Sequence, residues 1–313
     1  MDNIICVVGP TASGKTALAV EIAKWTNGEV VSCDSMQLYR RLSIGTAKPT
    51  AEEMQGIPHH MIDVCEPDED FSVGRYVEMA TPIVEDILRR GKTAVIAGGT
   101  GLYVDNLIKG GEFAPTPSTG CREKLEARLE LEGIGVLAAE LGAIDPVALE
   151  KSQGNPRRIL RALEVYQETG ETITAHNART AAIPPRFDPI WIGIDFASRQ
   201  ELYDRIDLRV ELMVKAGLLA EIRQVLDSGI PEKATAMQAI GYKEFIDAMA
   251  GRATIDEAIA QVQLSSRRYA KRQLTWFRRN PKIRWLIRQP GQTAEEIFSQ
   301  ARALLGISTS ESC

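Results

Sequence analysis

The feature that most constrains this chain is the octapeptide GPTASGKT at residues 9–16, which directly follows the apolar run IICVV at residues 4–8. It fits the pattern G-x-x-x-x-G-K-[ST], in which a glycine-rich loop joins a buried strand to a helix. The glycines let successive backbone N–H groups turn toward an anion, and the helix N-terminus adds partial positive charge. Such a strand–loop–helix unit is half of a βαβ crossover, so it predicts a parallel sheet flanked by helices.

The segments that follow continue this alternation of short apolar strands and helices. We expect strands at 29–34, 59–64, 93–99 and 190–196, and helices at 16–28 and 76–91. The predicted fold class is therefore α/β, with a P-loop-type parallel sheet core flanked by helices and a helical insertion domain.

A change of pattern near Gly110 suggests the domain boundaries. Residues 110–120 are rich in Gly, Pro and Thr, residues 121–180 look helical throughout, and a second break at 181–189 precedes the returning strand. We interpret 113–185 as a helical insertion and 1–112 with 186–313 as the P-loop core with a helical, basic C-terminal part. The alternative is that these helices simply pack on the sheet.

Beyond residue 197, helices are expected to dominate, beginning at a capping box formed by Ser198 and Glu201. The terminal STSESC (308–313) is expected to be disordered.

The composition argues against some classes of function but does not identify one. The net charge of −5 gives no global sign of nucleic-acid binding, and no apolar run reaches membrane-spanning length. The cysteines are odd in number and lack a CxxC spacing, so we expect free thiols in a reducing cytoplasm rather than a zinc site or a disulfide framework. They are Cys6, Cys33, Cys65, Cys121 and Cys313.

The loop predicts an anion site but not a reaction. Lys15 supplies a point charge for phosphate oxygens, and the Thr16 hydroxyl can ligate Mg²⁺. The strand at 93–99 is followed by Thr and Gly rather than by a metal-binding carboxylate, which argues against an ATPase or GTPase motor. The predicted diphosphate- or nucleotide-binding residues are Gly9, Pro10, Thr11, Ala12, Ser13, Gly14, Lys15 and Thr16.

Two other strand ends should face this loop, because ligands of open α/β sheets bind outside the carboxyl ends of the strands. One carries DSMQ at 34–37 and the other GGTGLY at 98–103. Asp34 could be an outer magnesium ligand, a general base or a helix N-cap. Thr100 could donate its hydroxyl to a leaving phosphate or belong to a tight turn. For His59 and His60 we favour structural hydrogen bonds.

Two basic segments could hold RNA. Residues 267–288 contain nine Lys or Arg and no Asp or Glu, interleaved with aromatic residues, which suits phosphate neutralisation and base stacking. The alternative is an ordinary amphipathic helix, and we expect Trp276 and Phe277 to be buried. Asn155-Pro156 predicts a helix start that places Arg157, Arg158 and Arg161 on one face. That face could also be merely solvated.

Taken together, the motifs resemble the bacterial tRNA dimethylallyltransferases, also called tRNA isopentenyltransferases. The resemblance spans nearly the whole chain and rests on eight segments in order: GPTASGKT (9–16), DSMQLYR (34–40), IGTAKPT (44–50), GIPHHMIDV (56–64), GGTGLY (98–103), RRILRALEV (157–165), QAIGYKE (238–244) and YAKRQLTWFRR (269–279). Two departures lie in the predicted insertion. The family usually has Gln-Arg where this chain has Arg157-Arg158, and residues 115–123 lack the acidic residue that commonly precedes the arginine.

The resemblance implies a reaction. The dimethylallyl group of dimethylallyl diphosphate moves to N6 of adenosine 37, beside the anticodon of tRNAs that read codons beginning with U, and diphosphate is released. Asp34, Thr100 and Lys15 are then the predicted catalytic residues, with Asp34 as the base and Mg²⁺ near Thr16 as cofactor. The tRNA-contacting residues implied are Asp34, Ser35, Met36, Gln37, Thr100, Arg122, Arg157, Arg158, Ile159, Leu160, Arg161, Gln238, Gly241, Tyr242, Lys243, Lys271, Arg272, Gln273 and Arg278.

Two other functions remain open from the residues alone. A P-loop nucleotide or small-molecule kinase would bind ATP in the same loop and use Asp34 to activate a hydroxyl, but it has no need of the basic segment at 267–288. A non-catalytic RNA-binding protein with a vestigial nucleotide fold would not need an intact Lys15-Thr16 and Asp34. We expect a cytoplasmic monomer that binds the anticodon stem-loop and no membrane.

Overall fold

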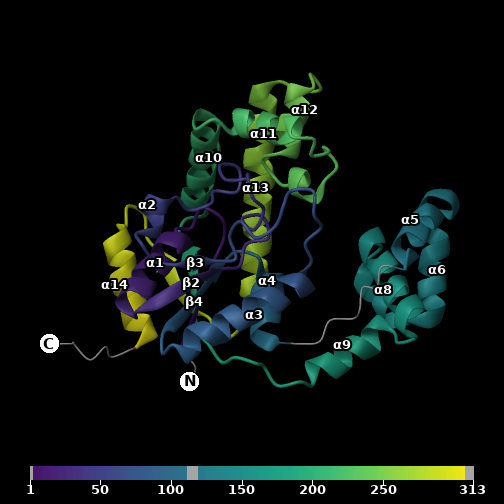
Figure 1. Cartoon of the computed structure of the whole chain (residues 1–313), viewed down its shortest axis with the longest axis horizontal. Helices are drawn as coiled ribbons and strands as arrows, with labels where there is room; N and C mark the ends of the chain where they lie inside the picture. Colours follow the sequence, from purple (N-terminus) through teal and green to yellow (C-terminus); the bar gives the residue numbers. More distant parts are fainter. Residues whose placement is uncertain (1–2, 111–118, 307–313) are drawn as a thin grey trace. The chain divides into compact units, whose positions relative to one another are not determined.

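The computed structural model describes residues 3–110 and 119–306, and confirms the predicted fold class (Figure 1). Six parallel strands form one sheet in the order β3-β2-β4-β1-β5-β6. The central position of β1 places the loop at 9–16 in the middle of the carboxyl edge of the sheet. The strands are β1 (Ile4–Val8), β2 (Gly28–Ser32), β3 (His59–His60), β4 (Thr93–Gly98), β5 (Ile190–Phe196) and β6 (Arg284–Arg288).

Helices connect these strands and continue beyond them. In the part of the chain that carries the sheet they are α1 (Lys15–Trp25), α2 (Ala51–Met54), α3 (Val73–Arg89), α4 (Gly101–Lys109), α10 (Arg199–Lys215), α11 (Leu218–Asp227), the 3-10 helix η1 (Thr235–Gln238), α12 (Lys243–Met249), α13 (Ile255–Phe277) and α14 (Ala294–Leu305).

The remaining helices follow one another without an intervening strand among the described residues 119–189. They are α5 (Cys121–Glu132), α6 (Ile134–Ile144), α7 (Pro146–Ser152), α8 (Pro156–Thr169) and α9 (Ile173–Ala181).

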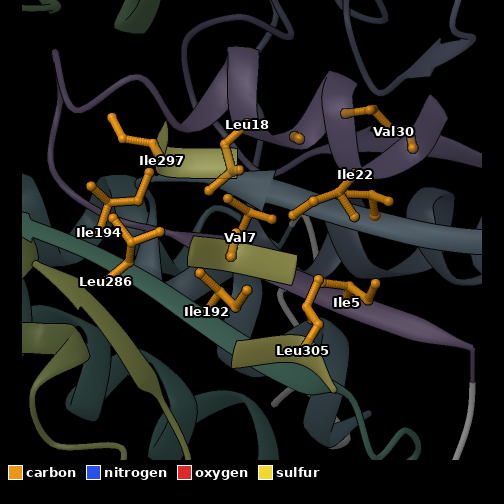
Figure 2. Packing of buried hydrophobic residues seen from close by; sticks show 14 residues of the cluster. Ile5, Val7, Leu18, Ile22, Val30, Ile192, Ile194, Leu286, Ile297 and Leu305 are labelled. Carbon is orange, nitrogen blue, oxygen red and sulfur yellow. The ribbon is translucent and has the colours of Figure 1, made fainter. Parts of the chain in front are cut away.

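One face of the sheet is covered by the first and last helices of the chain, α1 and α14. Their apolar side chains, such as Leu18, Ile22 and Ile297, meet strand residues such as Val7 and Ile194 (Figure 2). Nearly all of the strand residues of β1 and β5 are buried, which is typical of parallel strands covered on both faces. This packed layer fixes where each strand ends, and hence where the loops that follow can meet.

The chain forms two compact units: Met1–Ile108 with Phe187–Cys313, and Lys109–Arg186. The smaller unit has its own core, in which Leu125, Leu137 and Leu163 are buried together. Asp145 caps α7 and also accepts hydrogen bonds from the N–H (3.0 Å) and hydroxyl (2.8 Å) of Thr174, which ties α7 to α9. Contact of this unit with an anticodon loop stays a prediction.

One strand expectation is wrong, and the helix alternative for the basic segment holds only in part. The strand expected at 59–64 is limited to His59–His60, because Met61 and Asp63 have positive φ and turn the chain away from the sheet edge. The basic segment at 267–288 is not one helix, since α13 ends at Phe277 and residues 284–288 form the edge strand β6. Only Leu286 of β6 is buried, so the strand lacks the alternation of buried and exposed residues by which an edge strand is predicted.

The expected helix start at Ser198 is present, and the Ser198 hydroxyl accepts a hydrogen bond from the Glu201 N–H at 3.4 Å. The Glu201 carboxylate lies 3.5 Å from the Arg288 guanidinium, which explains its orientation toward β6. The expected disorder at 308–313 lies outside the described residues.

Candidate active site

The glycine-rich loop at 9–16 joins β1 to α1, as the motif predicts. Gly14 has φ 88°, a left-handed conformation that glycine adopts without strain, and α1 begins at the next residue. The Lys15 ammonium donates a hydrogen bond to the Pro10 carbonyl at 3.2 Å and so lies across its own loop. This geometry presents the N-terminus of α1 and a lysine to the same space, as an anion site requires.

A glutamine from the other end of the chain fastens this loop to β4. The amide oxygen of Gln273, on α13, accepts a hydrogen bond from the Thr11 N–H at 2.8 Å, and its amide nitrogen donates to the Gly99 carbonyl at 3.0 Å. Gly99 has to be glycine because a Cβ there would overlap the Gln273 amide. Gln273 is buried. Both ends of the side chain hold the phosphate loop in place, and the contact of Gln273 with RNA stays a prediction.

Two arginines of α10 also contact the loop, and the sequence motifs missed them. Arg205 Nε donates to the Ala12 carbonyl at 2.9 Å, and Arg209 Nη1 donates to the Thr11 hydroxyl at 3.3 Å. Burial lowers the pKa of Arg209, while the charge of Asp34 opposes that shift. Their i, i+4 spacing on a helix after β5 was the only local signal, and it is common among solvent-exposed arginines.

A small cavity of about 70 Å³ lies between the phosphate loop and the ends of β2 and β4. Lys15 and Thr16 line it from the loop side, and Asp34 and Gln37 line it from the side of β2. The other lining residues are Thr11, Thr46, Ala97, Gly98, Arg209, Tyr269 and Gln273. Lys15, Thr16 and Arg209 also line a larger open groove of about 690 Å³ that runs beside α10. The cavity thus has a cationic wall facing a carboxylate.

Burial alters the acidity of the groups around the cavity. It lowers the pKa of Lys15 to about 8, although the charge of Asp34 opposes the shift. A bound anion would raise that pKa again, since it favours the charged ammonium. Burial raises the pKa of the Cys33 thiol to about 12, so Cys33 is not a nucleophile at neutral pH. The free thiols Cys6, Cys33, Cys65 and Cys121 agree with the expected absence of a disulfide framework over the described residues.

Asp34 lies in the turn that follows β2. Its Oδ1 atom accepts hydrogen bonds from the N–H groups of Met36 (2.9 Å) and Gln37 (3.4 Å). No helix begins in the described residues directly after Asp34, so the helix N-cap considered for it is wrong, and the carboxylate closes a turn instead. It is compatible with a role as base, because both bonds use one carboxylate oxygen and the residue also lines the cavity.

Thr100 lies beside this turn. Its hydroxyl oxygen accepts a hydrogen bond from the Ser35 N–H at 3.1 Å, which joins the end of β4 to the end of β2. The Thr100 hydroxyl also donates to the Ser35 hydroxyl oxygen at 3.4 Å, so donation to a leaving phosphate would replace this long hydrogen bond. Thr100 and Ser35 are both half-buried, at the edge of the same strand ends as Asp34.

Gln37 is held in one orientation. Its amide nitrogen donates to the carbonyls of Ala47 (3.0 Å) and Thr46 (3.4 Å), and its amide oxygen accepts from the Ser32 hydroxyl at 3.2 Å. A bidentate contact with an adenine edge would need the nitrogen to leave both carbonyls. The oxygen retains a lone pair, so in this orientation Gln37 can accept a hydrogen bond from an amino group at the cavity.

The two histidines of β3 have the structural partners that we favoured. His59 Nδ1 lies 2.8 Å from the Ile57 carbonyl, and His60 Nε2 lies 2.8 Å from a carboxylate oxygen of Glu29. Burial lowers the pKa of His59.

Apart from Gln273, the predicted RNA-binding residues on α13 and at its C-terminus remain on the surface. Lys271 and Arg272 are exposed, and the Arg272 guanidinium lies 5.6 Å from the centre of the Tyr269 ring. Arg278 is exposed but forms a 2.6 Å ion pair with Asp195. The expected burial of aromatics is confirmed for Phe277 and only partly so for Trp276, which is half-buried and donates its indole N–H to Asp105 at 2.9 Å.

The residues of the predicted RNA-contacting turn at 238–243 differ in their exposure to solvent. Gln238 and Lys243 are exposed, whereas Gly241 and Tyr242 are buried. The Tyr242 hydroxyl donates to Glu221 at 2.7 Å, so its side chain is not available to RNA.

In the helical unit, Arg157 and Arg158 on α8 are exposed, while Arg161 is half-buried and pairs with Glu164 at 2.8 Å. Arg122 on α5 is half-buried and pairs with Glu126 at 2.8 Å. Ile159 and Leu160 are buried in the core of this unit, and their contact with RNA stays a prediction. They alternate with the arginines because one face of the helix has to pack against its neighbours.

A magnesium ion fits the site only if the substrate supplies most of its ligands. Among the described residues no group of three His, Cys, Asp or Glu side chains could hold a metal. Thr16 and Asp34 do offer oxygen atoms to the same cavity. Such a sparse oxygen donor set suits Mg²⁺, which keeps several waters and binds through one or two protein ligands plus substrate phosphates.

Fold and site together define a class: a P-loop α/β protein whose cavity sets an anion-binding loop against a carboxylate. The match to known proteins gives the family. Residues 37–280 match the IPP transferase family and residues 2–67 match the isopentenyl transferase family, so the chain belongs to the IPP transferase family. The predicted family and enzyme class are confirmed by this match and by the relatives described next.

A relative from Acetivibrio thermocellus, a tRNA dimethylallyltransferase, is 44% identical over 97% of this chain and 98% of its own. The tRNA isopentenylpyrophosphate transferase of Bacillus halodurans has a solved structure with a TM-score of 0.73 and 40% identity, over 98% of this chain and 96% of that one. A eukaryotic dimethylallyltransferase acting on tRNA has a TM-score of 0.82 and 27% identity, over 98% of this chain and 81% of that one.

The similarity to these transferases does not favour the P-loop kinase alternative. Within the described residues, no helix is both long and apolar enough to cross a membrane.

Proposed function

We propose that this protein transfers the dimethylallyl group of dimethylallyl diphosphate to N6 of adenosine 37, beside the anticodon of tRNAs that read codons beginning with U. The observation that carries the proposal is the shared cavity, in which the phosphate loop faces Asp34. Membership of the IPP transferase family supports the prenyl chemistry, and the names of the relatives support tRNA as acceptor.

On the donor side, breaking an allylic C–O bond leaves negative charge on the diphosphate, so stabilising that charge is most of the catalytic work. The loop amides and Lys15 supply positive potential, and Arg209 adds a guanidinium on the same wall. Thr100 would donate its hydroxyl proton to the departing oxygen. Magnesium, held near Thr16, would supply further neutralisation of the diphosphate charge when bound.

On the acceptor side, the lone pair of adenine N6 is delocalised into the ring, which makes it a poor nucleophile. Asp34 would remove a proton from N6 as the new C–N bond forms. The Gln37 amide oxygen would accept the second N6 proton in a hydrogen bond and so orient the amino group. The target base has to leave its stack to reach this cavity, and a loop nucleotide does so at lower cost than a paired one.

The RNA phosphates would be bound mainly by exposed basic residues, and not by every residue that the resemblance implies as a tRNA contact. Lys271 and Arg272 on α13 and Arg157 and Arg158 on α8 are exposed, so each can neutralise a phosphate. We keep Ser35, Met36, Gln238, Lys243, Arg122, Arg161 and Arg278 as proposed RNA contacts; several would have to exchange an intramolecular partner for RNA. We also propose a cytoplasmic location and a monomer, which size-exclusion chromatography with light scattering would test.

Labelled dimethylallyl diphosphate and an anticodon stem-loop containing the target adenosine test the proposal directly. Purified protein should transfer label to the RNA and release diphosphate in a Mg²⁺-dependent reaction. The matched control is a stem-loop with guanosine at the target position, which should stay unlabelled. A parallel tube with ATP and no prenyl donor tests the kinase alternative. Consumption of ATP without labelling of RNA would contradict the proposal.

A further inference from the structure

Two of the sequence motifs have no part in the chemistry described so far, and they meet in the structure. One is IGTAKPT at 44–50, and the other is QAIGYKE at 238–244. Gly45 of the first lies so close to Tyr242 of the second that a Cβ at Gly45 would overlap the Tyr242 ring. The residue that joins them is Glu221 on α11, which belongs to neither motif.

The Glu221 carboxylate is bound by four donors. Three are the consecutive backbone N–H groups of Ser43 (2.9 Å), Ile44 (2.7 Å) and Gly45 (3.2 Å). The fourth is the hydroxyl of Tyr242, at 2.7 Å. Three successive amides that converge on one anion resemble the amide nests that bind free anions in other proteins. Here a side chain of the same protein fills the nest.

The segment held in this way continues directly to the acceptor side of the cavity. The next two residues, Thr46 and Ala47, supply the carbonyls that accept from the Gln37 amide nitrogen. Thr46 and Gln37 both line the cavity that contains Asp34. Moving residues 43–45 would therefore move the carbonyls that decide which end of the Gln37 amide faces the cavity.

We propose that Glu221 is a positioning residue for the acceptor: it sets the loop at 43–47 so that the Gln37 amide oxygen, not its nitrogen, faces the amino group beside Asp34. Tyr242 assists by fixing the carboxylate and by filling the space beside Gly45. The inference rests on the proposed function, because it gives Gln37 the target amino group as partner.

A carboxylate is needed at Glu221 because every partner is a donor. In Glu221→Gln the amide nitrogen would be a donor facing donors, and at least one amide of residues 43–45 would lose its acceptor. Loss of a hydrogen bond to a charged group is expected to lower kcat/KM for the stem-loop by about tenfold to a hundredfold. Tyr242→Phe removes a single donor and keeps the ring, so its effect should be smaller and in the same direction.

The test combines kinetics with a measurement that does not require activity. Full-length Glu221→Gln, Tyr242→Phe and Gln37→Ala, and the double variant Glu221→Gln/Gln37→Ala, are compared for kcat and KM on the stem-loop. Amide hydrogen exchange is followed for peptides covering 43–47. We expect faster exchange there in both Glu221→Gln and Tyr242→Phe. In the double variant, kcat/KM should be no worse than in the poorer single variant, because both changes remove one function.

Glu29→Gln is the matched control. Like Glu221, Glu29 is a carboxylate with several donors, including Arg90 at 2.9 Å and Lys92 at 2.8 Å. It is buried, and it lies near the start of β2, away from the cavity at its end. Its substitution should cost stability, leave exchange at 43–47 unchanged and combine additively with Gln37→Ala.

The outcomes separate the two proposals. If wild-type protein does not prenylate the stem-loop, the proposed function fails whatever the exchange data show. If wild-type protein is active and Tyr242→Phe and Glu221→Gln both fold with unchanged kcat/KM, the positioning role is overturned. Additive effects of Glu221→Gln and Gln37→Ala would also overturn it, since Glu221 would then act as a general structural residue.

Discussion

The two walls of the cavity are built in different ways. The phosphate wall is made largely by consecutive residues, Gly9–Thr16, whose backbone groups do the binding. The acceptor wall is assembled from Asp34 and Gln37 after β2, from Thr46 in the next loop, and from Tyr269 on α13. A wall made of adjacent backbone groups can be recognised in the sequence as a short motif. A wall made of distant side chains corresponds only to scattered polar residues in the sequence. If the two walls also have separate functions, substitutions on one wall should leave the function of the other unchanged.

Substitution of Asp34 should have the largest effect. Asp34→Asn keeps the hydrogen bonds to the turn amides but removes the base, so kcat should fall by about a hundredfold to ten-thousandfold. The dissociation constant for the stem-loop should change by less than about twofold. Single-turnover kinetics and a filter-binding assay measure the two quantities, with the exposed Asp68→Asn as control. Equal losses of kcat and RNA affinity would make Asp34 a binding residue.

Removal of the Lys15 ammonium should come next. Lys15→Ala takes away one charge from the phosphate wall, and kcat/KM for dimethylallyl diphosphate should fall by about a hundredfold to a thousandfold. RNA affinity should stay constant if the two walls act separately. Steady-state kinetics with varied diphosphate substrate, beside equilibrium RNA binding, provide the measurement. Unchanged kinetics would remove the loop from the mechanism.

The glutamine that fastens the phosphate loop to the end of β4 should matter for stability. Gln273→Ala leaves the Thr11 N–H and the Gly99 carbonyl without their partner, which is expected to cost about 1–3 kcal/mol of unfolding free energy. Thermal and denaturant unfolding measure this cost, with the exposed Gln261→Ala on the same helix as control. A loss of RNA affinity at unchanged Tm would restore the RNA contact that the buried position argues against.

The pH dependence should identify the charge on the phosphate wall. The pKa of Lys15 is lowered to about 8, so its charge is present below pH 8 and is lost as pH rises through that value. kcat/KM for the diphosphate substrate should therefore decline above pH 8, by about tenfold per pH unit. An ordinary lysine would give a decline only near pH 10. Lys15→Ala, with its low activity, should lack the decline, and a wild-type profile flat to pH 9.5 would contradict the prediction.

Removal of surface charge on α13 should have the smallest effect. Lys271→Ala combined with Arg272→Ala should lower the slope of log K against log salt for stem-loop binding by roughly 1.4, if each residue contacts one phosphate of a single strand. Titrations at several salt concentrations measure the slope. Lys24→Ala, an exposed lysine on α1, serves as control. If the double variant keeps the wild-type slope, the RNA lies elsewhere.

Features that depend on neighbouring residues could be predicted from the sequence, and features that depend on contacts between distant residues could not. The P-loop, the sheet class and the positions of most strands along the chain followed from local patterns. The edge strand β6 did not, because its residues lack the alternation that marks a half-buried strand. Ile159, Leu160, Tyr242 and Gln273 lie within motifs that resemble RNA-contacting segments, yet they are buried. A motif records which residues occur together and does not distinguish those that touch a ligand from those that support them.

The sequence by itself determined an anion-binding loop between a buried strand and a helix, because that loop needs only adjacent backbone amides, glycine φ values and one lysine. Only the tertiary structure decided what faces it. Arg209, Gln273 and Glu221 come from helices far along the chain. The first two contact the phosphate loop directly, and Glu221 binds the backbone of residues 43–45, next to Thr46 of the cavity. The position of such a contact depends on how helices pack on a sheet, a property of the whole core that no short segment of sequence contains.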